Sequence, residues 1–327
     1  MRAVQVITTT GPADLEVRDV AEPVPGPDDV LVEVHSVGVS FPDLLLSRGE
    51  YQLRPEPPFT LGADFAGVVV SGAASGEGGL QPGMRVCGVA PYGSAAELVA
   101  NPVGSTFRLP DDVSFDEGAA LPMNYLTAHF TLAERAGLRE GETVLVLGAS
   151  GGVGTATLQV ARGLGARTVA AVSTHEKAAV ARVAGADEVV LLEGFRDAVR
   201  GLTGGRGVDV VVDPVGGDGF TDALRTLAPQ GRLMVVGFAA GQGIPEVRVN
   251  RLLLHNVDVR GVGWGAYAMV RPGYLQAQWE SLAPMLADGT IRPPVGATYG
   301  LGDFGRALAE IDERRVLGKT VVHVRQQ

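Results

Sequence analysis

The sequence predicts an α/β fold with a doubly wound parallel sheet, and two observations support that prediction. From residue 143 onward, short apolar runs alternate with stretches in which apolar residues recur every three or four positions. These runs are nearly uniformly apolar, which is typical of strands buried on both faces. Strands that alternate with helices in this way form parallel sheets covered by helices.

The predicted elements of this region follow one another in a regular order. The first strand covers residues 143–147 and leads into a helix at 155–164, which glycine brings to an end near residue 165. Further strands are expected at 168–172, 188–192, 208–212, 232–236 and 257–262, and further helices at 175–184 and 220–227. Six strands are therefore expected in this sheet.

The chain before residue 120 has a different texture. Short strand-like runs at 30–34, 66–70 and 85–89 are separated by clusters of proline and glycine such as residues 23–27. This pattern predicts a small, mostly antiparallel, barrel-like domain.

The last part of the chain is expected to rejoin this first domain. We predict a helix at 272–286 and a final strand at 320–324, which returns to the first domain and makes it discontinuous. The domains predicted on this basis are residues 1–121, an inserted nucleotide-binding domain at 122–265, and a return segment at 266–327.

Composition narrows the classes of function. The 327 residues carry a formal charge of −10, which argues against nucleic-acid binding through broad phosphate contact. Cys87 is the only cysteine, so no intrachain disulfide can form, and this fits a reducing cytoplasm. Residues 1–6 lack the apolar segment of a signal peptide, and no apolar run has membrane length. We expect a soluble cytoplasmic protein without nucleic-acid or membrane partners.

A glycine-rich stretch at residues 148–154 (GASGGVG) carries the strongest chemical signal. A strand, a tight turn and a helix in succession direct backbone N–H groups and the positive end of a helix dipole at a bound phosphate. Glycines are needed where a side chain would block the approach. Because the chain holds 46 glycines, the match depends on this context. The residues expected to bind a pyrophosphate are Gly148, Ser150, Gly151, Gly152, Val153 and Gly154.

Several segments together resemble the medium-chain dehydrogenase/reductase superfamily and, within it, the zinc-free quinone oxidoreductase branch. Besides the glycine-rich turn, they are residues 38–43 (GVSFPD), 49–51 (GEY), 58–69 (PFTLGADFAGVV), 82–86 (PGMRV), 121–128 (LPMNYLTA), 261–265 (GVGWG) and 318–322 (GKTVV). The resemblance implies a Rossmann domain inserted in a GroES-like, mostly β catalytic domain, with a cleft between them where a nicotinamide meets the substrate. It also implies a homodimer formed through the strand at 257–262.

The resemblance also implies that no metal is bound. Zinc alcohol dehydrogenases of this superfamily have a cysteine where this chain has Ser40, and a Gly-His-Glu motif where it has Gly62-Ala63-Asp64. The five histidines show no metal-ligand spacing. Without a Lewis acid to stabilise an alkoxide, hydride addition to an electron-poor acceptor is favoured over alcohol oxidation.

The end of the second strand favours NADPH as the cofactor. Enzymes that prefer NAD place an acidic residue there to bind the ribose hydroxyls, whereas this chain has Val172 followed by Ser173 and Thr174. Ser173 and Lys177 are expected to bind the 2′-phosphate. The alternative is that Lys177 is a solvated helix residue and Ser173 a helix cap. Leu192 stands where some relatives carry tyrosine beside the 2′-phosphate, so we expect a weaker preference for NADPH over NADH than in those relatives.

Tyr51 and Ser40 are the candidate catalytic residues. Reduction of a quinone or an α,β-unsaturated carbonyl needs a hydrogen-bond or proton donor where negative charge grows, and a phenol can donate while neutral. The alternatives are that Tyr51 forms a wall of the site and that water supplies the proton. Ser40 either bonds the nicotinamide ribose or the substrate oxygen, or is a turn residue.

Other cofactor contacts are expected beyond the carboxyl ends of the strands, where such sheets bind ligands. The candidates are Val215, Gly237, Phe238, Val262 and Gly263, together with Thr127, which the resemblance places beside the nicotinamide. The alternative role for Phe238 is core packing. The alternative for Thr127 is that it satisfies the backbone near the start of a helix. Lys319 either reaches a cofactor phosphate or caps a turn.

These inferences predict an NADPH-dependent, zinc-independent oxidoreductase that transfers hydride to a quinone or an α,β-unsaturated carbonyl. An enoyl-thioester reductase is one alternative, although it needs a basic surface for the carrier's phosphates, and Arg48, Arg54 and Arg271 are too scattered to show one. The other alternative is a catalytically idle NADPH-binding protein of the same fold.

Overall fold

The computed structural model describes residues 1–76 and 79–325, and the chain divides into two compact units. Unit 1 comprises Met1–Met123, Pro272–Trp279 and Val295–Gln327, and unit 2 comprises Asn124–Arg271 and Glu280–Pro294. The first boundary lies two residues from the one expected at 121. The second lies at 271 instead of 265, and residues 280–294 group with unit 2. Within the described ranges, no helix has the length and apolar character needed to cross a bilayer.

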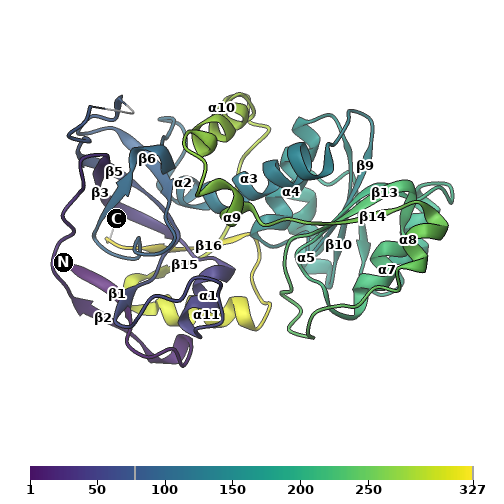
Figure 1. Cartoon of the computed structure of the whole chain (residues 1–327), viewed down its shortest axis with the longest axis horizontal. Helices are drawn as coiled ribbons and strands as arrows, with labels where there is room; N and C mark the ends of the chain where they lie inside the picture. The colour runs from purple at the N-terminus through teal and green to yellow at the C-terminus, as the bar shows by residue number, and fades with distance from the viewer. Residues whose placement is uncertain (77–78, 326–327) are drawn as a thin grey trace. The chain divides into compact units, whose positions relative to one another are not determined.

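The core of unit 2 is a six-stranded parallel sheet with the order β11-β10-β9-β12-β13-β14. Figure 1 labels β9, β10, β13 and β14 of this sheet. Its strands are β9 (Thr143–Leu147), β10 (Arg167–Val172), β11 (Glu188–Leu191), β12 (Val208–Asp213), β13 (Leu227–Val235) and β14 (Asp258–Gly261). Every residue of β9 and β12 is buried, which explains why these strands are mostly apolar, with Asp209 and Asp213 as the charged residues of β12. All six strands expected from the sequence are confirmed.

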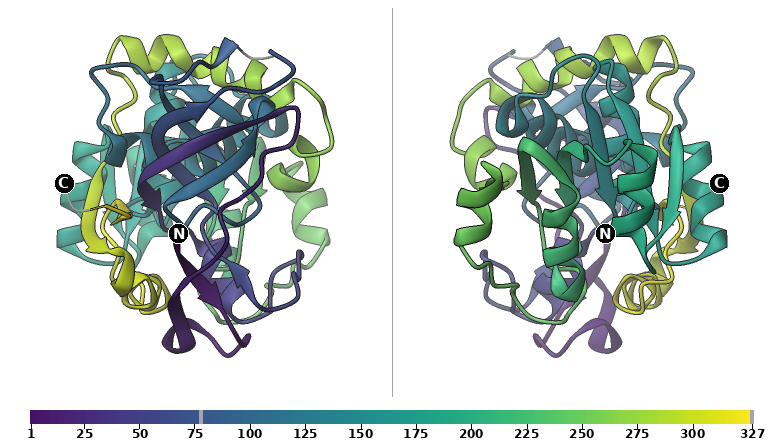
Figure 2. Two further views of the ribbon diagram at one scale, coloured as in Figure 1. Left: turned by 90° about the vertical axis from the view of Figure 1, so that its left-hand side faces the viewer. Right: turned by 90° about the vertical axis from the view of Figure 1, so that its right-hand side faces the viewer.

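Helices flank this sheet, as the right-hand view of Figure 2 shows. They are α4 (Gly152–Gly163), α5 (His175–Val183), α6 (Phe195–Leu202), α7 (Phe220–Arg225), α8 (Asn250–His255) and α9 (Trp264–Ala268), with the short turn η5 (Gly217–Gly219). Two helices run across the unit boundary, α3 (Pro122–His129), which continues as the π-helix η4 (Phe130–Ala136), and α10 (Tyr274–Ala287). The helices expected near 155–164, 175–184, 220–227 and 272–286 are confirmed.

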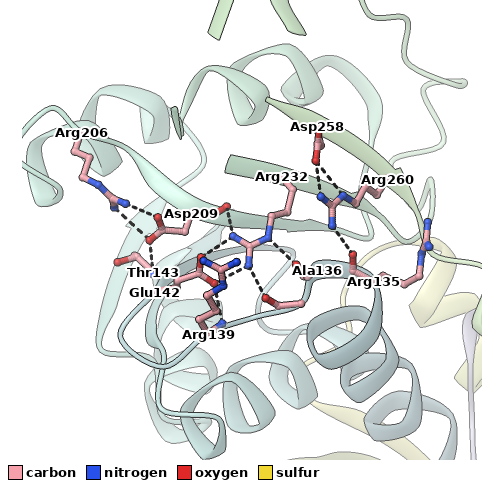
Figure 3. Close-up of polar contacts among 11 residues, drawn as sticks. Arg135, Ala136, Arg139, Glu142, Thr143, Arg206, Asp209, Arg232, Asp258 and Arg260 are labelled. Atoms are coloured by element: carbon pink, nitrogen blue, oxygen red, sulfur yellow. Dashed lines mark hydrogen bonds and ion pairs between the residues drawn. The ribbon is translucent and has the colours of Figure 1, made fainter. Parts of the chain in front are cut away.

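An ion network holds the amino-terminal ends of strands in unit 2 (Figure 3). The guanidinium of Arg232, 8% exposed, donates to both carboxylate oxygens of Glu142 at 2.8 and 2.6 Å and to the carbonyl of Ala136 at 2.8 Å. Asp209 accepts from the backbone N–H of Thr143 at 2.8 Å and from Arg206. These bonds connect β9, β12 and β13 at one edge of the sheet.

Unit 1 contains two mostly antiparallel sheets. The smaller has the order β2-β1-β4, with β1 (Arg2–Val6), β2 (Leu15–Asp19) and β4 (Phe59–Thr60). The larger has seven strands in the order β15-β16-β3-β5-β6-β8, with β7 paired to β3. Its strands are β3 (Asp29–Gly38), β5 (Asp64–Ser71), β6 (Arg85–Val89), β7 (Leu98–Pro102), β8 (Thr106–Arg108), β15 (Val295–Gly300) and β16 (Lys319–His323).

The return of the chain to its first domain is confirmed, because β16 pairs antiparallel with β3 and places Val322 opposite Val37. Among the described residues, unit 1 also has the α-helices α1 (Phe41–Ser47), α2 (Phe115–Ala120) and α11 (Phe304–Asp312), beside the first part of α10. The described part also has short 3₁₀ turns, η1 (Pro12–Asp14), η3 (Val103–Ser105) and η6 (Leu301–Asp303). An apolar core that includes Phe65 and Phe304 holds these elements together.

Candidate functional site

The glycine-rich turn of unit 2 joins the carboxyl end of β9 to the start of α4. Gly148 has φ of +58°, and a β-carbon on it would lie 2.8 Å from a methyl group of Val215. A β-carbon on Gly154 would collide with the carbonyl oxygen of Gly148, and one on Gly152 would lie 2.6 Å from the amide nitrogen of Asn124. Only glycine therefore lets the turn pack against its surroundings at these positions.

The first turn of α4 presents backbone N–H groups that have no partner within the helix. Gly151 is the N-cap and carries no side chain to satisfy them. Ser150 is buried beside this cap, and Val153 follows in the first turn. A twelve-residue helix also places the positive end of its dipole here. The turn from Gly148 to Gly154 is thus suited to an anion such as a pyrophosphate.

The carboxyl end of β10 carries the residues expected to discriminate between cofactors. Ser173 and Thr174 follow Val172 directly, and the ammonium of Lys177 donates to the hydroxyl of Ser173 at 3.2 Å. Thr174 caps α5 by accepting from the backbone N–H of Lys177 at 3.2 Å. The cap of this helix is therefore Thr174, and the capping role considered for Ser173 is wrong. Ser173 and Lys177 lie together at the sheet edge that also bears Gly148.

Asp213 orders the next loop along this edge and was not singled out from the sequence. One of its carboxylate oxygens accepts from the backbone N–H groups of Val215 and Gly216, both at 2.8 Å. The other oxygen is buried and has no hydrogen-bond partner. Burial raises the pKa of this carboxyl, although the two backbone hydrogen bonds oppose the shift. The Asp-Pro-Val-Gly-Gly sequence after a buried strand is the signal that identifies this turn.

The remaining candidates of unit 2 lie along the same edge because the strands are parallel. Gly237 and Phe238 follow β13, and Phe238 is 39% exposed, so complete core packing is excluded for it. Val262 and Gly263 follow β14, with the N–H of Val262 donating to the carbonyl of Val235 at 2.9 Å. Thr127 is buried within α3, and its carbonyl accepts from the hydroxyl of Thr131 at 2.7 Å.

Unit 1 contains a buried polar cluster formed by Ser40, Asp64 and Lys319. The Nζ of Lys319 lies 2.6 Å from Oδ2 of Asp64 and 2.7 Å from Oγ of Ser40, and this Oγ donates to Asp64 at 3.0 Å. The other oxygen of Asp64 accepts from the backbone N–H of Met123 at 2.8 Å. Lys319 thus bonds partners inside unit 1, and a cofactor phosphate contact for it stays a prediction.

Asp43 braces the loop that carries Ser40. Its Oδ2 accepts from the backbone N–H of Ser40 at 2.9 Å, and its Oδ1 accepts from that of Gly62 at 3.0 Å. Complete burial raises the pKa of Asp43 to about 7, against these two hydrogen bonds and the charge of Lys319, which lower it. The carboxyl therefore fixes the two segments that hold Ser40 and Asp64.

Tyr51 follows the Gly49 turn of unit 1 and is half-buried against the apolar core of that unit. Burial, with a smaller contribution from the charge of Asp43, raises the pKa of its phenol. The hydroxyl of Tyr51 therefore stays protonated at neutral pH and keeps its capacity to donate a hydrogen bond.

In the parallel sheet of unit 2, the strand order runs one way from β9 to β11 and the other way from β12 to β14. This order, with a glycine-rich turn after the first strand, defines a Rossmann-fold protein. Comparisons with known proteins place this chain more closely. Residues 26–111 match the family model of the alcohol dehydrogenase GroES-like domain, and residues 152–287 match that of the zinc-binding dehydrogenases. Quinone oxidoreductase-like protein 2 of Rattus norvegicus is 37% identical over 314 residues, which cover 95% of this chain and 89% of that protein.

Solved structures agree. A probable oxidoreductase from Mycobacterium abscessus has a TM-score of 0.89 at 43% identity, covering 99% of this chain and 98% of that chain. The quinone oxidoreductase of Thermus thermophilus, solved also in complex with NADPH, has a TM-score of 0.84 at 33% identity and covers 99% of this chain and all of that one. The chain belongs to the quinone oxidoreductase branch of the medium-chain dehydrogenase/reductase superfamily.

One matching family model is named for zinc, but the donor atoms at positions 40, 63 and 64 do not fit such an ion. Ala63 offers no ligand atom, and the Ser40 and Asp64 oxygens share the ammonium of Lys319 at 2.7 and 2.6 Å. A divalent cation at these oxygens would meet the charge of that ammonium. In the part of the chain that the structure describes, no group of three or more His, Cys, Asp or Glu side chains could hold a metal ion.

Proposed function

We propose that this protein is an NADPH-dependent, zinc-independent oxidoreductase that transfers a hydride to a quinone or an α,β-unsaturated carbonyl. The observation that carries the proposal is the edge of the unit 2 sheet, where the glycine-rich turn is followed on the neighbouring strand by Ser173 and Lys177 instead of a carboxylate. The complex of the Thermus thermophilus relative with NADPH supports this choice of cofactor.

The binding role of each residue follows from its chemistry. The amides from Gly148 to Gly154 would hold the pyrophosphate. The hydroxyl of Ser173 and the ammonium of Lys177 would bind the 2′-phosphate, and their mutual hydrogen bond of 3.2 Å already brings them together. Val215, Gly237, Phe238, Val262, Gly263 and Thr127 would line the path of the cofactor from the adenosine to the nicotinamide. The exposed ring face of Phe238 suits it to be an apolar wall.

The chemistry that NADPH supplies when bound is a hydride, so this chain must position the acceptor and stabilise the oxygen on which charge develops. Tyr51 is the proposed hydrogen-bond donor because its raised pKa keeps the phenol protonated. Ser40 has a different role, since its only hydroxyl proton is donated to Asp64. Its oxygen accepts from Lys319, so a contact between Ser40 and a ribose hydroxyl would have Ser40 as the acceptor.

A turnover panel tests this function. Purified full-length protein would be assayed for oxidation of NADPH and NADH with quinones, enones and enoyl thioesters, with zinc content measured on the same sample. Turnover of quinones or enones with NADPH, without stoichiometric zinc, is the expected result. Turnover of enoyl thioesters alone would select the thioester reductase instead, and NADPH binding without any turnover would select the idle protein.

The cytoplasmic location and the homodimer through β14 belong to the same proposal. β14 is the edge strand of the unit 2 sheet, and such an edge presents unpaired backbone groups. Light scattering of the purified protein would measure its mass, with twice the chain mass of 33.9 kDa as the expected value.

A further inference from the structure

Unit 2 contains a cavity of about 740 Å³ lined by an unusual number of basic side chains. Five of its lining residues are arginines and one is histidine, namely Arg196, Arg200, Arg206, Arg225, Arg251 and His255. Such a concentration of positive charge contrasts with the formal charge of −10 on the whole chain. We call this cavity the arginine pocket.

Three of the five arginines are paired with carboxylates. Arg196 bonds Asp197 at 2.9 Å, and Arg225 bonds Asp222 at 3.0 Å. Arg206 bonds Asp209 through two hydrogen bonds. The Arg196 and Arg225 pairs are partly exposed and weak, so these two guanidinium groups can turn toward a ligand without a large loss. Asp209 is only 12% exposed, so Arg206 is held more firmly.

Arg200 and Arg251 are different. Among the residues that the structure describes, neither guanidinium has a hydrogen bond or an ion pair, and Arg200 acts on Asp197 only as a more distant charge. The pocket therefore has two positive charges that its own carboxylates do not match. Two unmatched guanidinium groups facing one cavity repel each other unless an anion lies between them.

The arginine pocket is separate from the candidate cofactor site. Its lining includes Gly207, Leu227 and Val257, which lie at or just before the first residues of β12, β13 and β14. It therefore lies at the amino-terminal edge of the parallel sheet. The glycine-rich turn, Ser173 and Phe238 all follow the carboxyl ends of their strands, at the opposite edge. A ligand in the arginine pocket is thus not the cofactor in its expected place.

We propose that the arginine pocket binds a phosphorylated small molecule, with Arg200 and Arg251 contacting the phosphoryl oxygens. A phosphoryl dianion matches the two unpaired charges, and the planar fork of a guanidinium binds phosphate oxygens in pairs. The volume of about 740 Å³ exceeds what a free phosphate fills and lies within the range of sites for small organic ligands. The organic part would rest on Leu224, Leu227 and Pro229 of the same lining.

Calorimetric titration of the full-length protein with inorganic pyrophosphate tests the proposal. The Arg200→Gln/Arg251→Gln variant removes both unpaired charges and no contact that holds the fold, and Arg248→Gln is the matched control because Arg248 is exposed and does not line the pocket. Loss of two charge-assisted hydrogen bonds should weaken binding by about tenfold or more. The control should change it less than about twofold, since it removes only an exposed, screened charge outside the lining of the pocket.

Hydrogen–deuterium exchange locates the bound pyrophosphate, because the glycine-rich turn also attracts this anion. Protection of residues 196–207 and 251–257, lost in the double variant and kept in the control, supports the arginine pocket. Protection confined to residues 148–155, or equal weakening in both variants, overturns it. Pyrophosphate binding that is unchanged in the double variant also overturns the proposal.

Discussion

Lys319 and Asp64 form a buried ion pair that joins two segments far apart in the sequence. Nζ and Oδ2 are 2.6 Å apart, and the side chains are 5% and 0% exposed. The partners are 255 positions apart in the sequence. Their contact connects the start of β16 to the start of β5. Lys319 also donates to the hydroxyl oxygen of Ser40 at 2.7 Å.

Removal of Lys319 should be strongly destabilising. Lys319→Met leaves the carboxylate of Asp64 buried without its cation, and the expected loss is about 3–5 kcal/mol in the free energy of unfolding. Urea denaturation of both proteins measures it. Lys319→Met/Asp64→Asn removes the uncompensated charge and should recover part of the loss. A single variant as stable as the wild type would contradict the account of this pair.

Asp43 should make stability depend on pH in an unusual direction. Its pKa is raised to about 7 in the folded protein from 3.8, so the folded state holds a proton that the unfolded state releases. The contribution of this group therefore declines as pH rises from about 4 to 7. Asp43→Asn abolishes the titration but destabilises the loop, since an amide cannot accept both backbone hydrogen bonds.

Urea denaturation at several pH values measures this effect. The difference in unfolding free energy between wild type and Asp43→Asn should shrink as pH rises from about 4 to 7. Parallel stability curves would contradict the raised pKa.

Ser173→Asp should reverse the preference for NADPH. The new carboxylate would repel a 2′-phosphate and accept hydrogen bonds from a free ribose hydroxyl. The dissociation constant for NADPH should rise by about tenfold or more, which corresponds to about 1.4 kcal/mol, while that for NADH falls. Fluorescence titration with each cofactor measures both constants. Ser173→Ala is the matched control, and its preference should keep the wild-type direction.

Tyr51→Phe tests whether Tyr51 donates a hydrogen bond in the reaction or only packs against the bound molecule. The substitution removes only the hydroxyl, so a donor that acts in the transition state lowers kcat by about 10²-fold and leaves KM nearly unchanged. Steady-state kinetics with a quinone and an enone measure both parameters. An unchanged kcat would assign the proton to water and the ring to packing.

The sequence predicted most of the unit 2 sheet because the burial of β9, β10 and β12 on both faces leaves a readable apolar run at these central strands. It did not predict α6, although the apolar residues of this helix recur at helical spacing, because the helix has only eight residues and Gly194 precedes it without a side-chain cap. It also did not predict α8, which buries no residue. Short helices without a cap or a buried face give only a weak local signal.

The candidate site divides in the same way. The glycine-rich turn and the missing carboxylate at Ser173 are local features of the sequence, so they could be found without the structure. The surroundings of Lys319 could not, because they depend on the pairing of β16 with β3. Asp213 has a local turn sequence, but its buried unpartnered oxygen is visible only once the strands are in place.

The position of β16 between β15 and β3 has a consequence for synthesis of the chain. All six strands of the Rossmann sheet have been translated once residue 261 is made, so that sheet can assemble while the ribosome is still working. Residues 36–38 of β3 must wait for residues 319–323 before their partner in β16 exists. Until then this end of β3 stays open on one side, and premature termination would leave it exposed to pairing with other nascent chains.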